Sequence, residues 1–446
     1  MDSSIQFIAQ HEIAVTLKGR VTDRRQPVHL IFLIDTSDSM SDSDKLNSVK
    51  RSLEFIQPLL TPEDLVSMVQ FGDDSSVLLN KVAATDKDTI LYKINTLKTD
   101  GCTNLSAGLM NVRNCLLPST DRRKQGILLL TDGHANRGVN SPSGLNSIAT
   151  RLLTDRPDLT ITTIGYGHDH NAELLRNIGS TGGGSYNVVY TLENVATVFG
   201  EVLGGLTTVV AQNVTIHLPP GSVPKTAYPI TQENCGMIQV RVGDIYTENE
   251  IVVLATLPSG VDTVRVTGHN MLTFDTQDTL LTAESMSLGG NIPKHIEQAV
   301  FRYRVSQLLK RALDHSANHT ELKNDTNDLL AQLKDLPYVE EQLIQMMIDD
   351  LERILESFTT SLNFGATATN FAQHSAYLGL GRGLRSQEPE DPFNSVHEDP
   401  FQAPTRILQS TRSAVIDTTF SPFSNRRQRN VTTTLRATSS AAPNLQ

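Results

Sequence analysis

The chain has 446 residues, 38% of them hydrophobic, which supports ordinary globular cores and suggests about three domains. A net charge of -11 and a pI near 5.6 argue against nucleic acid as the main partner. No stretch approaches the roughly eighteen consecutive apolar residues of a membrane span, so no transmembrane helix is expected.

The compartment is predicted from the N-terminus and the cysteines. The first residues lack the basic and then apolar pattern of a signal peptide. Cys102, Cys115 and Cys235 are sparse, odd in number and not spaced as metal ligands. We therefore expect a reduced protein in the cytoplasm.

From residue 28 the chain alternates between predicted strands and helices. Val28 to Ile34 is an apolar run typical of a buried strand, and the helix after it, at about 44–58, has apolar residues at helical spacing. The next predicted elements are strands 65–71 and 76–82, helices near 86–97 and 104–116, strand 126–131, a helix near 143–154, strand 159–165, helix 171–179, strand 185–189 and a last helix at 191–206. This order predicts a parallel-type sheet with helices on both faces.

Polar residues follow two of these buried strands. Asp35 ends the first strand and is followed by Ser37 and Ser39, while Asp132 follows the strand at 126–131. Thr103 is predicted in a loop between two helices. Ligands of open α/β sheets bind at the carboxyl ends of the strands, and a set of carboxylate and hydroxyl oxygens suits Mg²⁺ or Mn²⁺. Helix capping would explain one of the serines, but not the whole set.

The set resembles the metal-ion-dependent adhesion site of von Willebrand factor A (VWA) domains. Its five members here are Asp35, Ser37, Ser39, Thr103 and Asp132. The resemblance implies that the three hydroxyls coordinate the cation directly and that the two carboxylates often act through water. One coordination position is then left for an Asp or Glu of a protein ligand. Asp42 lies where some integrin subunits place a carboxylate for a second cation, the alternative being a solvated acidic loop.

Short segments rich in Val, Ile and Thr follow the α/β region. They are 209–218, 237–242, 251–257, 263–267 and 271–274, and turn sequences separate them. This pattern predicts an antiparallel β-sandwich. The alternating stretch 12–21 is expected to join it, so that the α/β domain is inserted in the sandwich. The regions 243–246 and 250–253 resemble the part of inter-α-trypsin inhibitor heavy chains that follows the A domain, and intracellular plant VWA proteins have a similar arrangement.

The last third of the chain divides into helices and a tail. Apolar stripes predict three helices between Ile292 and Phe358, forming a hairpin or bundle packed on the sandwich, with dimerisation as an alternative role. Past about 365 the composition predicts disorder. The predicted divisions are 1–25 (strands joining the sandwich), 26–207 (VWA domain), 208–288 (β-sandwich), 289–362 (helices) and 363–446 (tail).

Two triplets in the tail suggest an alternative function. Asp391-Pro392-Phe393 and Asp399-Pro400-Phe401 resemble the short motifs that endocytic adaptor appendages bind. Another alternative is a substrate-recruiting subunit in a ubiquitin pathway, because related ligases join this domain pair to a cysteine-rich zinc module. Three scattered cysteines cannot build such a module.

Enzymatic alternatives are weaker. A haloacid-dehalogenase-type phosphatase needs a second carboxylate two residues after the first, and Ser37 stands there. His134, His168 and His170 could suggest zinc, but a polar loop favours surface histidines. Metal-assisted hydrolysis is a formal alternative, since a cation with an open position can activate water, but the sequence shows no positioned base for it. We predict a non-enzymatic, divalent-cation-dependent protein-binding module or scaffold.

Overall fold

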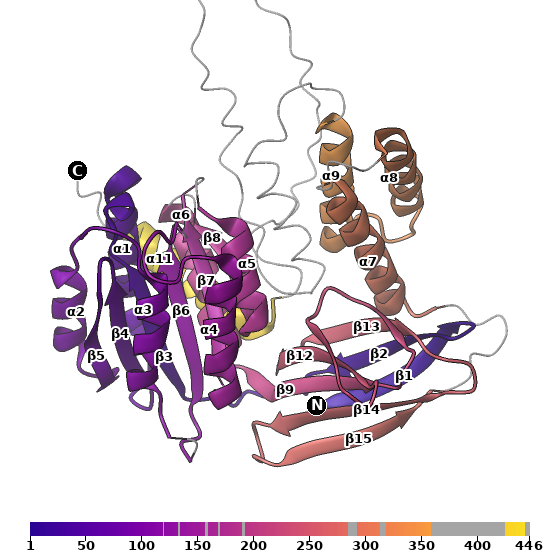
Figure 1. The fold of residues 1–446 in the computed structure, drawn as a ribbon, viewed down its shortest axis with the longest axis horizontal. Helices are drawn as coiled ribbons and strands as arrows, with labels where there is room; N and C mark the ends of the chain where they lie inside the picture. Colours follow the sequence, from indigo (N-terminus) through magenta and orange to yellow (C-terminus); the bar gives the residue numbers. More distant parts are fainter. Residues whose placement is uncertain are drawn as a thin grey trace, which may run out of the picture.

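The structure is a computed structural model that describes residues 1–118, 120–132, 134–156, 159–167, 170–189, 192–283, 292–312, 318–357 and 424–441. In these residues the chain forms an α/β domain, two antiparallel sheets and a group of helices beyond them (Figure 1). This architecture confirms the predicted fold class.

A six-stranded sheet forms the centre of the α/β domain, in the order β5-β4-β3-β6-β7-β8. Its strands are β3 (Val28–Asp35), β4 (Leu65–Phe71), β5 (Ser75–Ala83), β6 (Lys124–Thr131), β7 (Leu159–Tyr166) and β8 (Gly183–Val189). Neighbouring strands are parallel except β4 and β5, which form an antiparallel pair at one edge.

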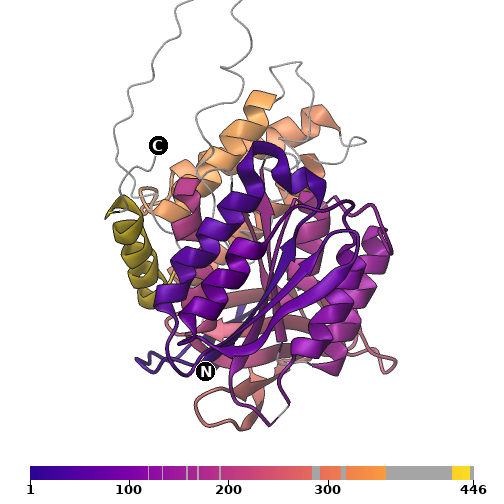
Figure 2. The ribbon, with the colours of Figure 1, turned by 90° about the vertical axis from the view of Figure 1, so that its left-hand side faces the viewer.

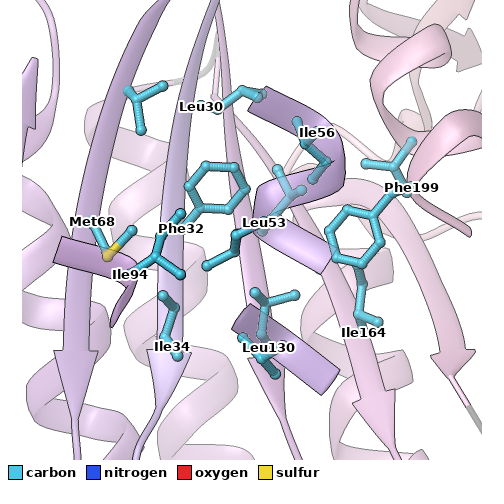
Figure 3. Close-up of a cluster of buried hydrophobic side chains, with 14 of the residues drawn as sticks. Leu30, Phe32, Ile34, Leu53, Ile56, Met68, Ile94, Leu130, Ile164 and Phe199 are labelled. Atoms are coloured by element: carbon cyan, nitrogen blue, oxygen red, sulfur yellow. The ribbon is translucent and has the colours of Figure 1, made fainter. Parts of the chain in front are cut away.

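Helices cover both faces of this sheet, because its central strands are apolar on both sides. On β3, Phe32 and Ile34 belong to one core, whereas Ile31 and Leu33 belong to the other. The first core, part of which is shown in Figure 3, includes α1 (Lys45–Ile56), α2 (Lys87–Thr96) and α6 (Leu192–Leu206). The second core includes α3 (Leu105–Asn111), α4 (Pro142–Asp155) and α5 (Ala172–Thr181).

The two antiparallel sheets enclose a core of their own. One sheet contains β1 (Asp2–Ala9), β2 (Glu12–Lys18), β13 (Glu250–Thr256) and β10 (Val223–Lys225). The other contains β11 (Ile230–Gln232), β12 (Ile238–Tyr246), β9 (Val209–Leu218), β14 (Thr263–Asn270) and β15 (Thr276–Thr282). Because β2 pairs with β13 over its whole length, the α/β domain is inserted between strands of one sheet.

One predicted strand of this region is wrong. Residues 271–273 form a turn, Phe274 after it has a φ of 62°, and the strand begins only at Thr276. A positive φ interrupts the extended backbone of a strand. Because bulky apolar residues rarely adopt a positive φ, the sequence did not indicate this interruption. The short strands β10 and β11 were not predicted either.

A buried ion pair joins the α/β domain to the second sheet. Lys124 Nζ, at the start of β6, lies 2.8 Å from Asp244 Oδ2 on β12, and the two side chains are 0% and 4% exposed. The Thr160 hydroxyl also donates to this carboxylate, over 2.9 Å. Removing one member of a buried pair leaves an uncompensated charge, so this contact fixes the junction.

Three helices follow the sandwich: α7 (Lys294–Ala312), α8 (His319–Lys334) and α9 (Gln342–Ser357). They share one apolar core, and the first half of α7 packs on β2 and β13 through Ile296 and Ala299. In the described part of the chain no helix has the length and apolar character needed to cross a bilayer.

A further helix, α11 (Arg426–Ala441), lies in the tail and packs beside α6 (Figures 1 and 2). The prediction of disorder is therefore wrong for this segment. Two glycines of α6 allow the approach, since a Cβ would lie 2.7 Å from Thr432 Cα at Gly200 and 2.6 Å from Gln428 Cα at Gly204. The Gln428 amide donates to the Glu201 carbonyl oxygen over 3.0 Å.

We predict that Gly204→Ala separates α11 from α6. The added methyl group would meet backbone atoms of Gln428, and overpacking of this kind costs typically 1–3 kcal/mol. Amide hydrogen exchange in residues 426–441 should therefore accelerate about tenfold or more.

Gly205→Ala is the matched control, because it brings the same gain in helix propensity. Its Cβ would lie 3.2 Å from the amide nitrogen of the flexible Gln428 side chain and 3.6 Å from the Tyr246 ring, but it would meet no backbone atom of α11, so exchange in α11 should accelerate far less than in Gly204→Ala. Unchanged exchange in the Gly204 variant would contradict the tight docking.

Candidate metal centre

The predicted metal residues lie at the point where the sheet changes direction. Strands β3 and β6 are parallel neighbours; from β3 the chain continues to β4 on one side, and from β6 to β7 on the other. Asp35 ends β3 and Asp132 follows β6, both 0% exposed. The carboxyl edge at such a switch point is where open α/β sheets bind ligands.

The Asp35 carboxylate is held by hydrogen bonds to both oxygens. The Ser37 main-chain N–H donates to Oδ1 over 2.9 Å, and the Thr131 hydroxyl donates to Oδ2 over 2.5 Å. Burial raises the pKa of Asp35 to about 6, although these hydrogen bonds oppose the rise, and the nearby charge of Asp132 adds to it. The carboxylate is therefore ionised at neutral pH, but its buried charge lowers the stability of the folded protein.

The two serine hydroxyls lie together beside Asp35. Ser37 Oγ and Ser39 Oγ are 3.0 Å apart. Ser37 precedes a 3-10 segment, Asp38–Asp44, but its side chain makes no capping hydrogen bond there. The capping alternative thus lacks the contact it requires.

Thr103 is brought to the same edge by loops bonded to one another. The Asp38 N–H donates to the Gly101 carbonyl oxygen over 2.9 Å, which ties the serine loop to the threonine loop. On the other side, the Asn136 N–H donates to the Thr103 carbonyl oxygen over 3.1 Å, which ties the threonine loop to the segment after Asp132. Thr103 itself is 2% exposed.

Asp132 has one oxygen paired and one without a partner. Lys45 Nζ lies 3.2 Å from Oδ2, in an ion pair whose side chains are 6% and 0% exposed. Oδ1 is buried and has no hydrogen-bond partner among the described residues. A buried, unpartnered carboxylate oxygen is costly, and a cation or one of its water ligands would satisfy it.

Lys45 was not predicted, although the sequence contained a signal for it. It is the first residue of α1, and its side chain is buried there. A cation at a helix N-terminus is disfavoured by the helix dipole. A basic residue in that place indicates a tertiary partner that outweighs the local cost.

The residues present fit a hard divalent cation. Two carboxylates and three hydroxyls offer only oxygen ligands, as Mg²⁺ and Mn²⁺ prefer. In the part of the chain that the structure describes, no group of three or more His, Cys, Asp and Glu side chains is arranged to hold a metal, so no rival centre of that kind is found there.

The remaining predicted residues lie apart from this arrangement or outside the described residues. Asp42 is exposed in the 3-10 segment, and its second cation stays a prediction. His170 was predicted on the surface, but it is 4% exposed and bonded to the Gly167 carbonyl oxygen, over 2.7 Å, and to the Tyr186 hydroxyl. His168 and both D-P-F triplets, at 391–393 and 399–401, fall outside the described residues.

Comparison with known sequences finds distant relatives. YfbK of Escherichia coli (strain K12) is 25% identical over 280 residues, which are 58% of this chain and 48% of YfbK. The protein sll0103 of Synechocystis is 27% identical over 262 residues, which are 56% of this chain and 61% of sll0103. Human inter-alpha-trypsin inhibitor heavy chain H6 is 25% identical over 174 residues, 36% of this chain and 13% of that protein. The chain thus spans less than two thirds of these relatives.

Solved structures share the fold over most of the chain. A von Willebrand factor type A protein from Catenulispora acidiphila superposes with a TM-score of 0.57 at 14% identity, covering 85% of this chain and 96% of that one. The ArnB paralog VWA2 from Sulfolobus acidocaldarius gives 0.55 at 15% identity, with the same coverage. At such identities the likeness concerns the fold alone.

The family model of the von Willebrand factor type A domain matches residues 29–202. This range runs from β3 into α6 and so contains all five predicted metal residues. Residues 29–202 therefore form a von Willebrand factor type A domain, a kind of domain that typically binds proteins, in a chain that is distantly similar to YfbK, sll0103 and inter-alpha-trypsin inhibitor heavy chain H6.

Proposed function

We propose that this chain binds a protein partner through a divalent cation, Mg²⁺ or Mn²⁺. Asp35, Ser37, Ser39, Thr103 and Asp132 would hold the cation. When bound, the cation supplies an electrophile with a coordination position for an acidic side chain of the partner. The observation that carries the proposal is the buried Oδ1 of Asp132, which has no partner among the described residues and lies at the switch point of the sheet.

Recognition is favoured over catalysis by the surroundings of Asp35. Its described hydrogen-bond partners are the Ser37 main-chain N–H and the hydroxyls of Ser37 and Thr131, none of which is a general base at neutral pH. Ser37 occupies the place where a second carboxylate would act in aspartyl-phosphate chemistry. The site therefore offers ligands for a cation without a group that would activate water.

The charge around the site narrows the kind of partner. Exposed acidic residues on the surrounding loops are Asp38, Asp42, Asp44, Asp74 and Asp100. Arg137, from the loop after Asp132, is paired with Asp73 at 2.8 Å, so its charge is already balanced. Like charges across an interface are costly, so a suitable partner presents its Asp or Glu among Lys and Arg residues.

The first test compares two serines of the same loop. Ser39→Ala removes a proposed ligand, whereas the exposed Ser41 hydroxyl donates to the Asp38 carbonyl oxygen and is outside the proposed set. We expect Mn²⁺ affinity, measured by electron paramagnetic resonance of the free ion, to fall about tenfold or more in Ser39→Ala, a loss typical of altered metal-site contacts. Ser41→Ala should bind as the wild type does.

The same pair of variants tests partner binding. Proteins retained by the wild-type chain in Mg²⁺ and released by EDTA should be retained by Ser41→Ala and lost with Ser39→Ala. A wild-type chain that binds neither Mn²⁺ nor Mg²⁺ would overturn the proposal.

A second prediction concerns the cost of the buried Asp35 charge. Its folded-state pKa of about 6 lies above the ordinary carboxyl pKa of 3.8, so the folded protein binds the proton more tightly than the unfolded chain. Without metal, ionisation therefore destabilises the fold above pH 6, and this penalty disappears as the pH falls toward 4. Asp35→Asn should raise the metal-free unfolding free energy at pH 7 by about 1–3 kcal/mol, with no gain near pH 4.

Thermal unfolding with and without Mg²⁺ completes this test. Mg²⁺ should raise the melting temperature of the wild type, because ligands that bind only the folded state stabilise it. The asparagine variant should be more stable than the wild type without metal and unresponsive to Mg²⁺. A variant that still responds fully to Mg²⁺ would contradict the role of Asp35.

A further inference from the structure

We infer that Lys45 is a positioning residue of the metal centre, one that weakens cation binding and strengthens the grip on the partner's carboxylate. The inference rests on the proposed function and adds a residue outside the predicted set. It starts from the buried ion pair between Lys45 Nζ and Asp132 Oδ2, at 3.2 Å.

The local sequence gives Lys45 no reason to lie at this helix start. The residue before it, Asp44, is the N-cap of α1 in the left-handed region, with a φ of 58°, and its side chain makes no capping bond. The first turn of α1 has no acidic residue to offset the helix dipole. The ammonium is therefore stabilised by Asp132 across the sheet edge.

The two oxygens of Asp132 have separate surroundings. Oδ2 faces Lys45, while Oδ1 is buried and has no hydrogen-bond partner among the described residues. Lys45 can therefore stay paired with Oδ2 while Oδ1 serves the cation or its water. The cation and Lys45 therefore do not have to compete for the same oxygen of Asp132, and the cation can bind without displacing the lysine.

The charge of Lys45 decides how this pair affects the binding of the cation and of a partner's carboxylate. Asp35 and Asp132 together carry -2, which cancels the charge of a divalent cation and leaves a neutral centre with little attraction for an anion. When the ammonium of Lys45 is included, the charges of the cation, Asp35, Asp132 and Lys45 sum to +1. In a buried site this charge acts at short range with little screening, so it favours a partner's carboxylate and opposes the metal.

The test is whether replacing Lys45 changes the affinities for Mn²⁺ and for acetate in opposite directions. In Lys45→Met, made in the full chain, we expect Mn²⁺ to bind about tenfold tighter and acetate to bind the Mn²⁺-loaded chain about tenfold weaker, the size of effect that one nearby charge gives in a partly screened site. Free Mn²⁺ is measured by electron paramagnetic resonance. Acetate binding is measured by its effect on water-proton relaxation, because a carboxylate replaces a water on the ion.

Two further variants control for charge and folding. Lys98→Met removes an exposed lysine from the loop before Asp100 and changes the net charge equally, so both affinities should stay near the wild-type values. Lys45→Gln keeps an N–H donor for Asp132 without the charge. It should behave as Lys45→Met, and it carries the test if the methionine variant fails to fold.

Each other outcome overturns the inference. Tighter Mn²⁺ with unchanged acetate affinity would make Lys45 a mere competitor of the cation. Two unchanged affinities, or a fall in both, would make the ion pair purely structural. A wild-type chain that binds no Mn²⁺ would instead defeat the proposed function itself, so the two failures are distinguishable.

Discussion

The parallel pairing of β3 with β6 is the constraint on which the rest of this structure depends. The register runs from Val28 opposite Lys124 to Ile34 opposite Leu130, so the two strands end almost level. That register brings Asp35 and Asp132 to one edge. It also gives β6 a buried ion pair at each end, Lys124 with Asp244 at its start and Lys45 with Asp132 just beyond its end. A shift of register would disturb the domain junction and the proposed metal centre together.

Much of the fold could be predicted because the signals are local. Strand β4 begins and ends at the predicted residues, and β3 ends one residue later than predicted, since apolar runs on a doubly covered sheet end abruptly at polar residues. The two aspartates could be placed at one edge for the same reason. That inference needed only the order of the elements and the rule for parallel sheets.

The wrong predictions for His170 and α11 and the missed Lys45 have a common cause: in each case a partner distant in the sequence overrides the local preference. His170 lies in a polar stretch, yet it is buried because Tyr186 and the Gly167 carbonyl oxygen satisfy its ring nitrogens. Helix α11 contains few large apolar residues, but backbone contact with two glycines of α6 needs none. Lys45 opposes the helix dipole in its own element and forms a buried ion pair with Asp132, which is distant in the sequence.

Helices α9 and α11 are both anchored to folded parts of the chain, α9 in the core it shares with α7 and α8, and α11 on α6. Helix α11 also contacts α1, the helix that begins with Lys45. Docking of α11 therefore adds support to the helix that carries one member of the buried Lys45–Asp132 pair.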